Sequence, residues 1–251
     1  IFCTTDQIEE EILNLLTFSI KLLKSFGFES IEADLSTRPD KSIGNINDWE
    51  KATNSLKSAL ENQNISYVTA HGEGAFYGPK IDLHVKDAIG RRWQLSTIQV
   101  DFAQPNNFDL QFVDSNNKRV KPVMIHRALL GSIERFTGIL IENYAGEFPG
   151  WLSPVQVKVL TIGDVSNYLN KITKSLKGFR YDVDDRNLRL GEKLHDASKD
   201  KVPITLIVGE KDELSNTLAL NIRSQDNQQN VKYEDAIKQI KANLKTPIFK
   251  I

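Results

Sequence analysis

The sequence has very little cysteine and no long apolar run. Its 251 residues include one cysteine, Cys3, so neither an intrachain disulfide nor a cysteine-rich zinc site can form within the chain. No apolar run approaches the ~18 residues of a membrane-spanning helix, and the N-terminus lacks the basic-then-apolar pattern of a secretion signal. These absences exclude a disulfide-stapled secreted fold and predict a protein of a reducing compartment that makes no use of a membrane.

The chain also lacks an excess of either charge. It has 32 Lys and Arg against 33 Asp and Glu, a net charge of −1, which is unlike a basic DNA-binding domain. The charge is unevenly distributed, however: residues 1–150 sum to −5 and residues 151–251 sum to +4. The C-terminal part is therefore the predicted polyanion-binding part.

Glycine and proline mark a domain boundary at 150–154, and the sequence pattern differs on its two sides. Before it, the pattern predicts an α+β domain with an antiparallel sheet, with helices at 5–25, 47–60 and 128–144 and strands at 28–36, 65–70, 80–86, 92–102 and 122–125. After it, the pattern predicts a three-layer α/β/α domain with a mixed sheet and a hairpin around 210–216, with strands at 155–162, 181–183, 204–208 and 218–222 and helices at 165–176, 191–198 and 233–244.

The predicted hairpin of residues 80–86 and 92–102 contains a break in its alternation. Gln94, Thr97 and Gln99 are out of step with strict alternation, so they can share one face only if the strand bulges near Leu95–Ser96. Bulges often lie next to active sites, which makes this face a candidate site.

The densest cluster of glycine and functional side chains is Gly72–Lys80. The lysine is not followed by Ser or Thr and the segment leads into a strand, so it is neither a P-loop nor a dinucleotide fingerprint. Two interpretations remain: a glycine-rich turn, or a loop that lets a substrate approach the backbone beside Tyr77 and Lys80.

A second constellation occupies residues 123–135. On the predicted helix, Gly131, Ser132 and Arg135 would share one side, and arginine suits nucleotide phosphates. Arg135 could equally be an exposed or Glu-paired helix residue. His126 alone is most simply structural, because no Cys or second His is spaced to complete a zinc site with it.

Taken together, four segments resemble the class II threonyl-tRNA synthetases over essentially the whole chain: Gly72–Lys80, Trp93–Phe102, Pro122–Arg135 and Phe148–Gln156. The resemblance implies activation of L-threonine with ATP and Mg²⁺ to threonyl-adenylate, and transfer of threonine to the 3′-terminal adenosine of tRNA(Thr). It further implies a homodimer in the cytoplasm, with an organelle as the open alternative. Chemistry of this kind depends on positioning the reactants and neutralising charge.

The resemblance assigns roles to individual residues. It implies that Arg135 and Lys80 are catalytic, with an ATP site formed by Gln94, Thr97 and Arg135 and a threonine site formed by Tyr77, Lys80 and Gln99.

By the same resemblance, His126 is one of three ligands of a zinc ion that binds the amino and hydroxyl groups of threonine. Zinc can separate threonine from isosteric valine, which a hydrophobic pocket does poorly. The other two ligands are expected before residue 1, and Cys3 matches a family position that is not a ligand.

Residues 151–251 resemble the anticodon-binding domain of class II synthetases. The matching segments imply tRNA contacts by Arg186, Asn187, Asp212 and Arg223. The alternative for each of them is a solvated position on the surface of an α/β domain.

We therefore expect residues 1–150 to be the C-terminal part of a synthetase catalytic domain that contains motif 3. The chain opens on Ile1 without methionine, and motif 2 would precede it, so the chain alone is expected to be inactive. The alternative is a noncatalytic tRNA-binding or accessory module. Such a module need not retain the residues implied for catalysis, namely Lys80, Gln94, Gln99, His126 and Arg135. A synthetase for another amino acid is disfavoured by His126, because zinc recognition of a hydroxyl suits threonine.

Overall fold

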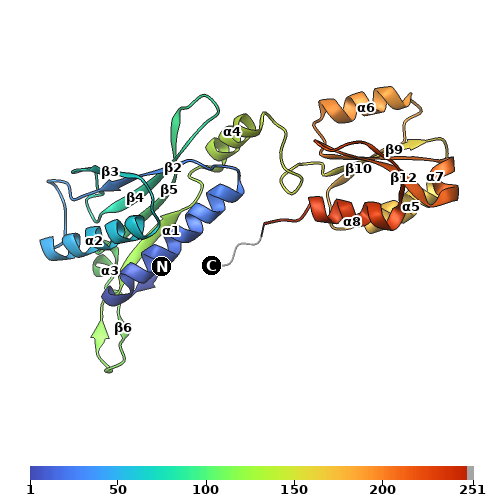
Figure 1. The fold of residues 1–251 in the computed structure, drawn as a ribbon. Coiled ribbons are helices and arrows are strands. Elements are labelled where there is room, and N and C mark those ends of the chain that lie inside the picture. The colour runs from blue at the N-terminus through green and yellow to red at the C-terminus, as the bar shows by residue number, and fades with distance from the viewer. Residues whose placement is uncertain (248–251) are drawn as a thin grey trace. The chain divides into compact units, whose positions relative to one another are not determined.

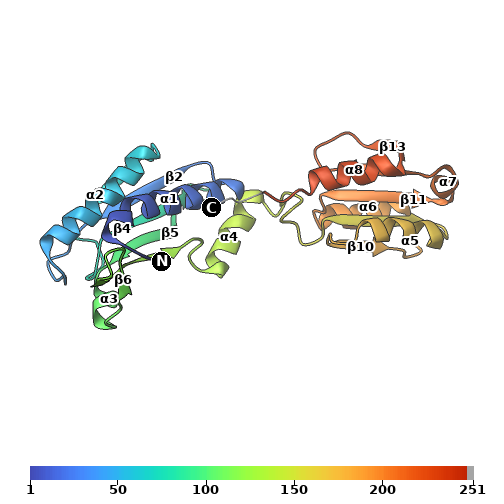
Figure 2. The same cartoon turned by 90° about the horizontal axis from the view of Figure 1, so that it is seen from below.

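In the computed structural model, which describes residues 1–247, the chain folds as two compact units, 1–143 and 144–247 (Figures 1 and 2). The predicted boundary segment at 150–154 lies within the second unit, a few residues after its start. None of the described helices combines the length and the apolar character needed to span a membrane.

The first unit is built on a six-stranded sheet. Its strands, in spatial order, are β1 (Phe2–Cys3), β8 (Val123–Ala128), β5 (Arg92–Asp101), β4 (Lys80–Lys86), β2 (Ile31–Ser36) and β3 (Tyr67–Ala70). All neighbours pair antiparallel except β2 and β3, which are parallel, so the predicted largely antiparallel sheet is confirmed. A separate two-stranded ribbon, β6 (Phe112–Val113) with β7 (Arg119–Val120), lies in a segment for which no strand was predicted.

Helices α1 (Ile8–Ser25) and α2 (Ile46–Asn62) pack against each other and against this sheet (Figure 1). A short 3₁₀ turn precedes α1. After the last residue of α1, the chain leaves the helix through Gly27, which adopts the left-handed region with a φ of 86°. Helix α2 begins before the predicted Asn47, because the side chain of Asn45 caps it by accepting a hydrogen bond from the Asp48 N–H at 2.8 Å.

The helices cover the apolar face of the sheet and leave a polar face. Ile81, Leu83 and Val85 alternate along β4, and Ile98 and Val100 along β5, all at 1% exposure or less. Because successive side chains of a strand point to opposite faces, the polar residues between them lie on the face away from α1 and α2.

The predicted helix at 128–144 begins later than expected. Strand β8 continues to Ala128, which pairs with Thr97, and the helix, α4, spans Ile133–Tyr144. Between them Gly131 has a φ of 65°, a conformation that a helix excludes. Ser132 therefore precedes the helix, and its Oγ accepts a hydrogen bond from the Arg135 N–H at 3.2 Å.

The second unit is a three-layer α/β/α domain, as predicted. Its sheet has the spatial order β10 (Tyr181–Asp184), β9 (Val157–Ile162), β11 (Ile204–Gly209), β12 (Thr217–Ile222) and β13 (Gln228–Lys232). β10, β9 and β11 are parallel, whereas β12 and β13 pair antiparallel, which gives a mixed sheet. Helix α6 (Leu190–Lys199) lies on one side, and α5 (Ser166–Ser175) and α8 (Tyr233–Asn243) lie on the other (Figure 1).

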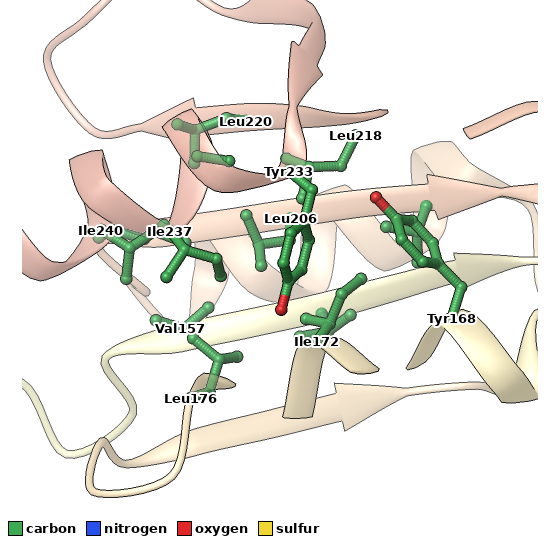
Figure 3. Close-up of a cluster of buried hydrophobic side chains, with 14 of the residues drawn as sticks. Val157, Tyr168, Ile172, Leu176, Leu206, Leu218, Leu220, Tyr233, Ile237 and Ile240 are labelled. Atoms are coloured by element: carbon green, nitrogen blue, oxygen red, sulfur yellow. The ribbon is translucent and has the colours of Figure 1, made fainter. Parts of the chain in front are cut away.

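The core of this unit lies between the sheet and helices α5 and α8 (Figure 3). Val157, Leu206 and Leu220 come from three neighbouring strands and meet Ile172 and Ile240 of the helices, all at 1% exposure or less. Burying such side chains contributes roughly 1.5–3 kcal/mol each, which holds the layers together.

Two features of the second unit differ from the simple pattern. The predicted hairpin around 210–216 is present as the antiparallel pair β11 and β12, but a short helix, α7 (Glu210–Ser215), forms the connection. Strand β13 was not predicted, because its Gln-Gln-Asn-Val-Lys sequence has little intrinsic preference for a strand.

Candidate functional site

Three predicted site residues lie opposite one another on the polar face of the first unit. Lys80 of β4 pairs with Gln99 of β5, and Gln99 pairs with His126 of β8. Directly opposed side chains on one face stand about 4.5–5.5 Å apart at Cβ. We call Lys80, Gln99 and His126 the polar row.

Tyr77 reaches the polar row from the glycine-rich segment. Its hydroxyl donates a hydrogen bond to Oε1 of Gln99 at 2.8 Å, and its ring lies 6.2 Å from that of His126 in an edge arrangement. The structure therefore brings together Tyr77 and Gln99, two of the predicted threonine-site residues, and His126.

The glycine-rich segment itself packs tightly on the sheet. A Cβ at Gly78 would lie 1.6 Å from the backbone oxygen of Val100, and a Cβ at Gly74 would lie 2.5 Å from that of Thr37. Close backbone approach requires both glycines, and the same packing carries Tyr77 to the polar row.

A carboxylate that the sequence reasoning missed joins two predicted residues. Oδ2 of Asp82 lies 2.6 Å from Nζ of Lys80, and its Oδ1 accepts a hydrogen bond from Nε2 of Gln94 at 2.6 Å. The Asp82 side chain is only 8% exposed, so the two contacts compensate a buried charge. Its position two residues after Lys80, on the same face of a strand, was the signal that could have found it.

The predicted bulge is confirmed. Leu83 pairs with Ser96 whereas His84 pairs with Gln94, so Leu95 is the extra residue in β5. The bulge places Gln94 on the polar face, together with Thr97. The Thr97 hydroxyl is already engaged, because it donates a hydrogen bond to the Ile81 backbone oxygen at 3.2 Å.

His126 makes a short contact with a second missed carboxylate. Its Nε2 lies 2.8 Å from Oδ2 of Asp101, whose side chain is 1% exposed while that of His126 is 41% exposed. The described residues contain no group of three or more His, Cys, Asp or Glu side chains that could hold a metal. His126 is therefore the one zinc ligand predicted in this chain, and residues 1–247 do not supply the other ligands that a zinc site needs.

His84 also lies on the polar face and was missed. Its Nδ1 is buried and has no hydrogen-bond partner among the described residues, and its Nε2 lies 3.7 Å from Oδ2 of Asp34. Burial lowers the pKa of this imidazole, so it stays neutral at physiological pH.

Arg135 lies near the start of α4, where its guanidinium carbon is 5.8 Å from the centre of the Trp93 ring. That distance is within the range of a cation–π contact. Within the described chain no hydrogen bond or ion pair joins Arg135 to the polar row.

The Trp93 ring is held by a buried turn carboxylate. Its Nε1 donates a hydrogen bond to Oδ2 of Asp87 at 2.8 Å, and Nε of Arg91 donates to the same oxygen at 2.6 Å. Burial alone would raise the pKa of Asp87, but these donors and two backbone N–H groups lower it to about 2. Asp87 is thus a fixed anion that orients the surface on which Arg135 lies.

In the second unit, three of the predicted tRNA-contact residues follow the carboxyl ends of parallel strands. Arg186 and Asn187 follow β10, and Asp212 lies in α7 directly after β11. Carboxyl ends of parallel strands meet at one edge of a sheet, where ligands of open α/β sheets usually bind. We call this the loop edge.

Two of these side chains have partners within the unit. Arg186 donates to Asp184 and to Asp196, at 2.6 and 2.7 Å, and its hydrogen bond to Asp184 keeps the pKa of Asp184 below its ordinary value. Oδ2 of Asp212 accepts a hydrogen bond from the Gly209 N–H at 2.9 Å and so caps α7. Asn187, by contrast, is exposed on the loop.

Arg223 lies at the opposite edge. It follows β12, which runs antiparallel to β11, so it stands beside Pro203 at the start of β11. Its guanidinium donates to the backbone oxygens of Lys201 at 3.0 Å and Glu147 at 3.1 Å, and also to that of Phe148. The structure does not bring Arg223 together with the other predicted contacts.

Comparison with known proteins assigns both parts of the chain. Residues 1–144 match the family described as tRNA synthetase class II core domain (G, H, P, S and T), and residues 156–243 match the family described as anticodon binding domain. The threonine–tRNA ligase of Clostridium tetani is 50% identical over 228 residues, covering 90% of this chain and 36% of that protein. The threonine–tRNA ligase of Petrotoga mobilis is 46% identical, over 98% of this chain and 39% of that protein.

A solved structure has the same fold. The RNA binding domain of threonyl-tRNA synthetase from Cryptosporidium parvum superimposes with a TM-score of 0.90 at 33% identity, over 98% of this chain and 62% of that chain. This chain spans about two fifths or less of the length of the curated relatives it matches.

Proposed function

Because the chain belongs to the class II aminoacyl-tRNA synthetases, we propose that it is part of a threonine–tRNA ligase. The observation that carries the proposal is the polar row with Tyr77, which gathers hydrogen-bonding groups, an ammonium and an imidazole on one polar sheet face. The two curated relatives of 46–50% identity are threonine–tRNA ligases, which supports threonine as the substrate.

In this proposal the protein positions threonine and ATP and neutralises charge while the threonine carboxylate attacks the α-phosphate and pyrophosphate leaves. Lys80, fixed by Asp82, stands beside the reacting carboxylate and phosphate, and Gln99 and Tyr77 face the amino acid. An ammonium held in place before the reaction stabilises developing negative charge without reorganisation at that moment.

ATP, with Mg²⁺, is proposed to occupy the part of this face nearest the bulge. Gln94 and Thr97 lie there, and Arg135 is the cation proposed for its phosphates. The contact between Arg135 and Trp93 is weak enough, at about 0.5–1 kcal/mol for an exposed pair, for phosphate to displace it.

Zinc is proposed as the threonine-recognising metal, with His126 as the ligand from this chain. The side chain fits, because its imidazole is partly exposed on the polar face and one ring nitrogen is held by a carboxylate. When bound, zinc would ligate the threonine hydroxyl, which valine lacks. The remaining ligands would have to come from outside residues 1–247.

We propose that residues 151–251 bind the anticodon of tRNA(Thr), with Arg186, Asn187 and Asp212 at the loop edge. The net charge of +4 of this part supports contact with RNA phosphates, and exposed polar side chains suit single-stranded bases. Arg223 remains a predicted contact, although three backbone oxygens already engage its guanidinium. A cytoplasmic homodimer completes the proposal and rests on the family resemblance alone.

Threonine-dependent ATP–pyrophosphate exchange by the full-length protein that contains this chain tests the proposal. We expect exchange with threonine and little with valine, and we expect His126→Ala to lose threonine activation. Absence of threonine-dependent exchange in the full-length protein would favour the noncatalytic tRNA-binding module. Full activity and full rejection of valine by His126→Ala would refute the zinc assignment.

A further inference from the structure

Asp101 is a buried carboxylate at the end of β5, and its two oxygens have different partners. Oδ1 accepts hydrogen bonds from the backbone N–H groups of Ala103 at 2.7 Å and Gln104 at 3.0 Å. Oδ2 lies 2.8 Å from Nε2 of His126. Because Asp101 is 0% exposed, the two backbone hydrogen bonds fix its orientation and water does not compete for Oδ2.

We propose that Asp101 is a positioning residue that holds His126 as the tautomer with its proton on Nε2, which leaves Nδ1 as the atom that ligates zinc. An ionised carboxylate only accepts hydrogen bonds, so Nε2 must be the donor. A neutral imidazole carries one ring proton, so Nδ1 then has a free lone pair. The ligand part of this inference rests on the zinc site of the proposed function.

The surroundings of His126 leave Nδ1 free for this role. Within residues 1–247 the His126 ring makes one hydrogen bond, between Nε2 and Asp101, and Nδ1 has no hydrogen-bond partner. The nearby hydroxyl of Tyr77 is directed to Gln99 at 2.8 Å instead. Nδ1 therefore needs no bond to break before it binds a metal.

The arrangement also has a general physical rationale. A carboxylate that accepts the second N–H of a ligating histidine fixes the ring and raises the basicity of the ligand nitrogen. Loss of such a partner typically lowers metal affinity about 10- to 100-fold. Asp101 thus supplies a role that no ligand-spacing pattern in the sequence reveals.

Asp101→Asn tests the inference with little change of shape. The retained Oδ1 still accepts from Ala103 and Gln104, whereas the new amide donates to Nε2 and so moves the ring proton to Nδ1. Long-range ¹H–¹⁵N NMR of the histidine-labelled 251-residue chain reports which ring nitrogen is protonated. The chain has four histidines, and His126→Gln assigns the signal.

At a pH at which the ring is neutral, we expect Nε2 to be protonated and Nδ1 to be bare in the wild type, and the reverse in Asp101→Asn. In the full-length protein we expect Asp101→Asn to bind zinc about 10- to 100-fold more weakly, measured by competition with a chromogenic chelator. A wild-type spectrum in which the neutral ring carries its proton on Nδ1 would overturn the inference, and this measurement needs no variant to fold.

Wild-type zinc affinity in a folded Asp101→Asn protein would overturn the ligand role of Nδ1. If the wild-type full-length protein binds no zinc, the zinc assignment of the proposed function fails, and the ligand role of Nδ1 fails with it. The NMR result then still decides whether Asp101 sets the tautomer, so the two failures are distinguishable.

Discussion

Single carboxylates fix the side chains on which the candidate site depends. Asp82 holds Lys80 and Gln94, and Asp101 holds His126. In each case the carboxylate is buried and its partner is more exposed. Removing such a carboxylate leaves a cation or a donor without its acceptor, which is costly where water cannot replace it.

Asp82→Asn is expected to reduce kcat/KM for threonine-dependent pyrophosphate exchange by about tenfold or more, equivalent to about 1.4 kcal/mol. The physical reason is that Lys80 loses its ion-pair partner while the size of the side chain is kept. Asp34→Asn is the matched control, because Asp34 is on the same face but pairs with the exposed Arg92. Equal losses in the two variants would contradict a specific role for Asp82.

The pKa of Asp87 makes a prediction about stability and pH. Its folded-state pKa of about 2 is below the ordinary value of 3.8, so its stabilising effect is complete above pH ~4 and is lost as the pH falls through 2. The free-energy difference between wild type and Asp87→Asn, measured by urea unfolding, should therefore shrink between about pH 4 and pH 2. A constant difference over that interval would contradict this assignment.

At the scale of elements, the sequence pattern predicted those boundaries that depend on residues close together in the chain. The bulge near Leu95–Ser96 and the end of the first helix at residue 25 were both predicted, since a break in the alternation and the end of an apolar stripe are visible in the sequence. The start of α4 was predicted too early, at Ala128. Pairing of Ala128 with Thr97 decides that boundary, and a contact between residues so far apart in the chain leaves no local trace.

Some residues of the candidate site were predicted from the sequence, and others were found only in the structure. Family resemblance identified the polar row. Asp82 could have been found from its position two residues after Lys80 in the same strand, whereas Asp101 became visible only when the pairing of β5 with β8 placed it beside His126. Arg223 shows the converse: the resemblance grouped it with the other tRNA contacts, although the predicted hairpin around 210–216 already made β12 antiparallel to β11 and so moved Arg223 away from the loop edge.

The glycine-rich element yields a prediction of its own. Gly78→Ala should destabilise the protein by about 1–3 kcal/mol or more, because its Cβ would overlap the backbone oxygen of Val100. Gly138→Ala in α4 is the control: nothing lies within 4 Å of a Cβ there, so a gain of about 0.5–1 kcal/mol is expected. Chemical denaturation measures the unfolding free energy of both variants. An unchanged unfolding free energy in Gly78→Ala would show that the close approach of Gly78 to Val100 is not needed.

At the scale of the whole molecule, the two units are expected to respond separately. Arg223→Ala should lower the unfolding free energy of the second unit by about 1–3 kcal/mol, because three backbone oxygens lose a donor. Asn187→Ala should weaken binding of tRNA(Thr) without changing stability, because the side chain is exposed at the loop edge. Thermal denaturation measures the stability of each variant, and filter binding measures its affinity for tRNA(Thr). If Arg223→Ala lost tRNA binding while its stability stayed unchanged, Arg223 would contact tRNA directly and the structural role expected for it would be wrong.

The central claim is that the polar row and Tyr77 form the site where threonine meets ATP. Its most direct test is calorimetric binding of a non-hydrolysable threonyl-adenylate analogue to the full-length protein that contains this chain. The account predicts tight binding that Lys80→Ala and Tyr77→Phe weaken, and that the control Tyr67→Phe, whose hydroxyl contacts Glu61 on the surface, leaves unchanged. Undiminished binding by both Lys80→Ala and Tyr77→Phe would contradict it.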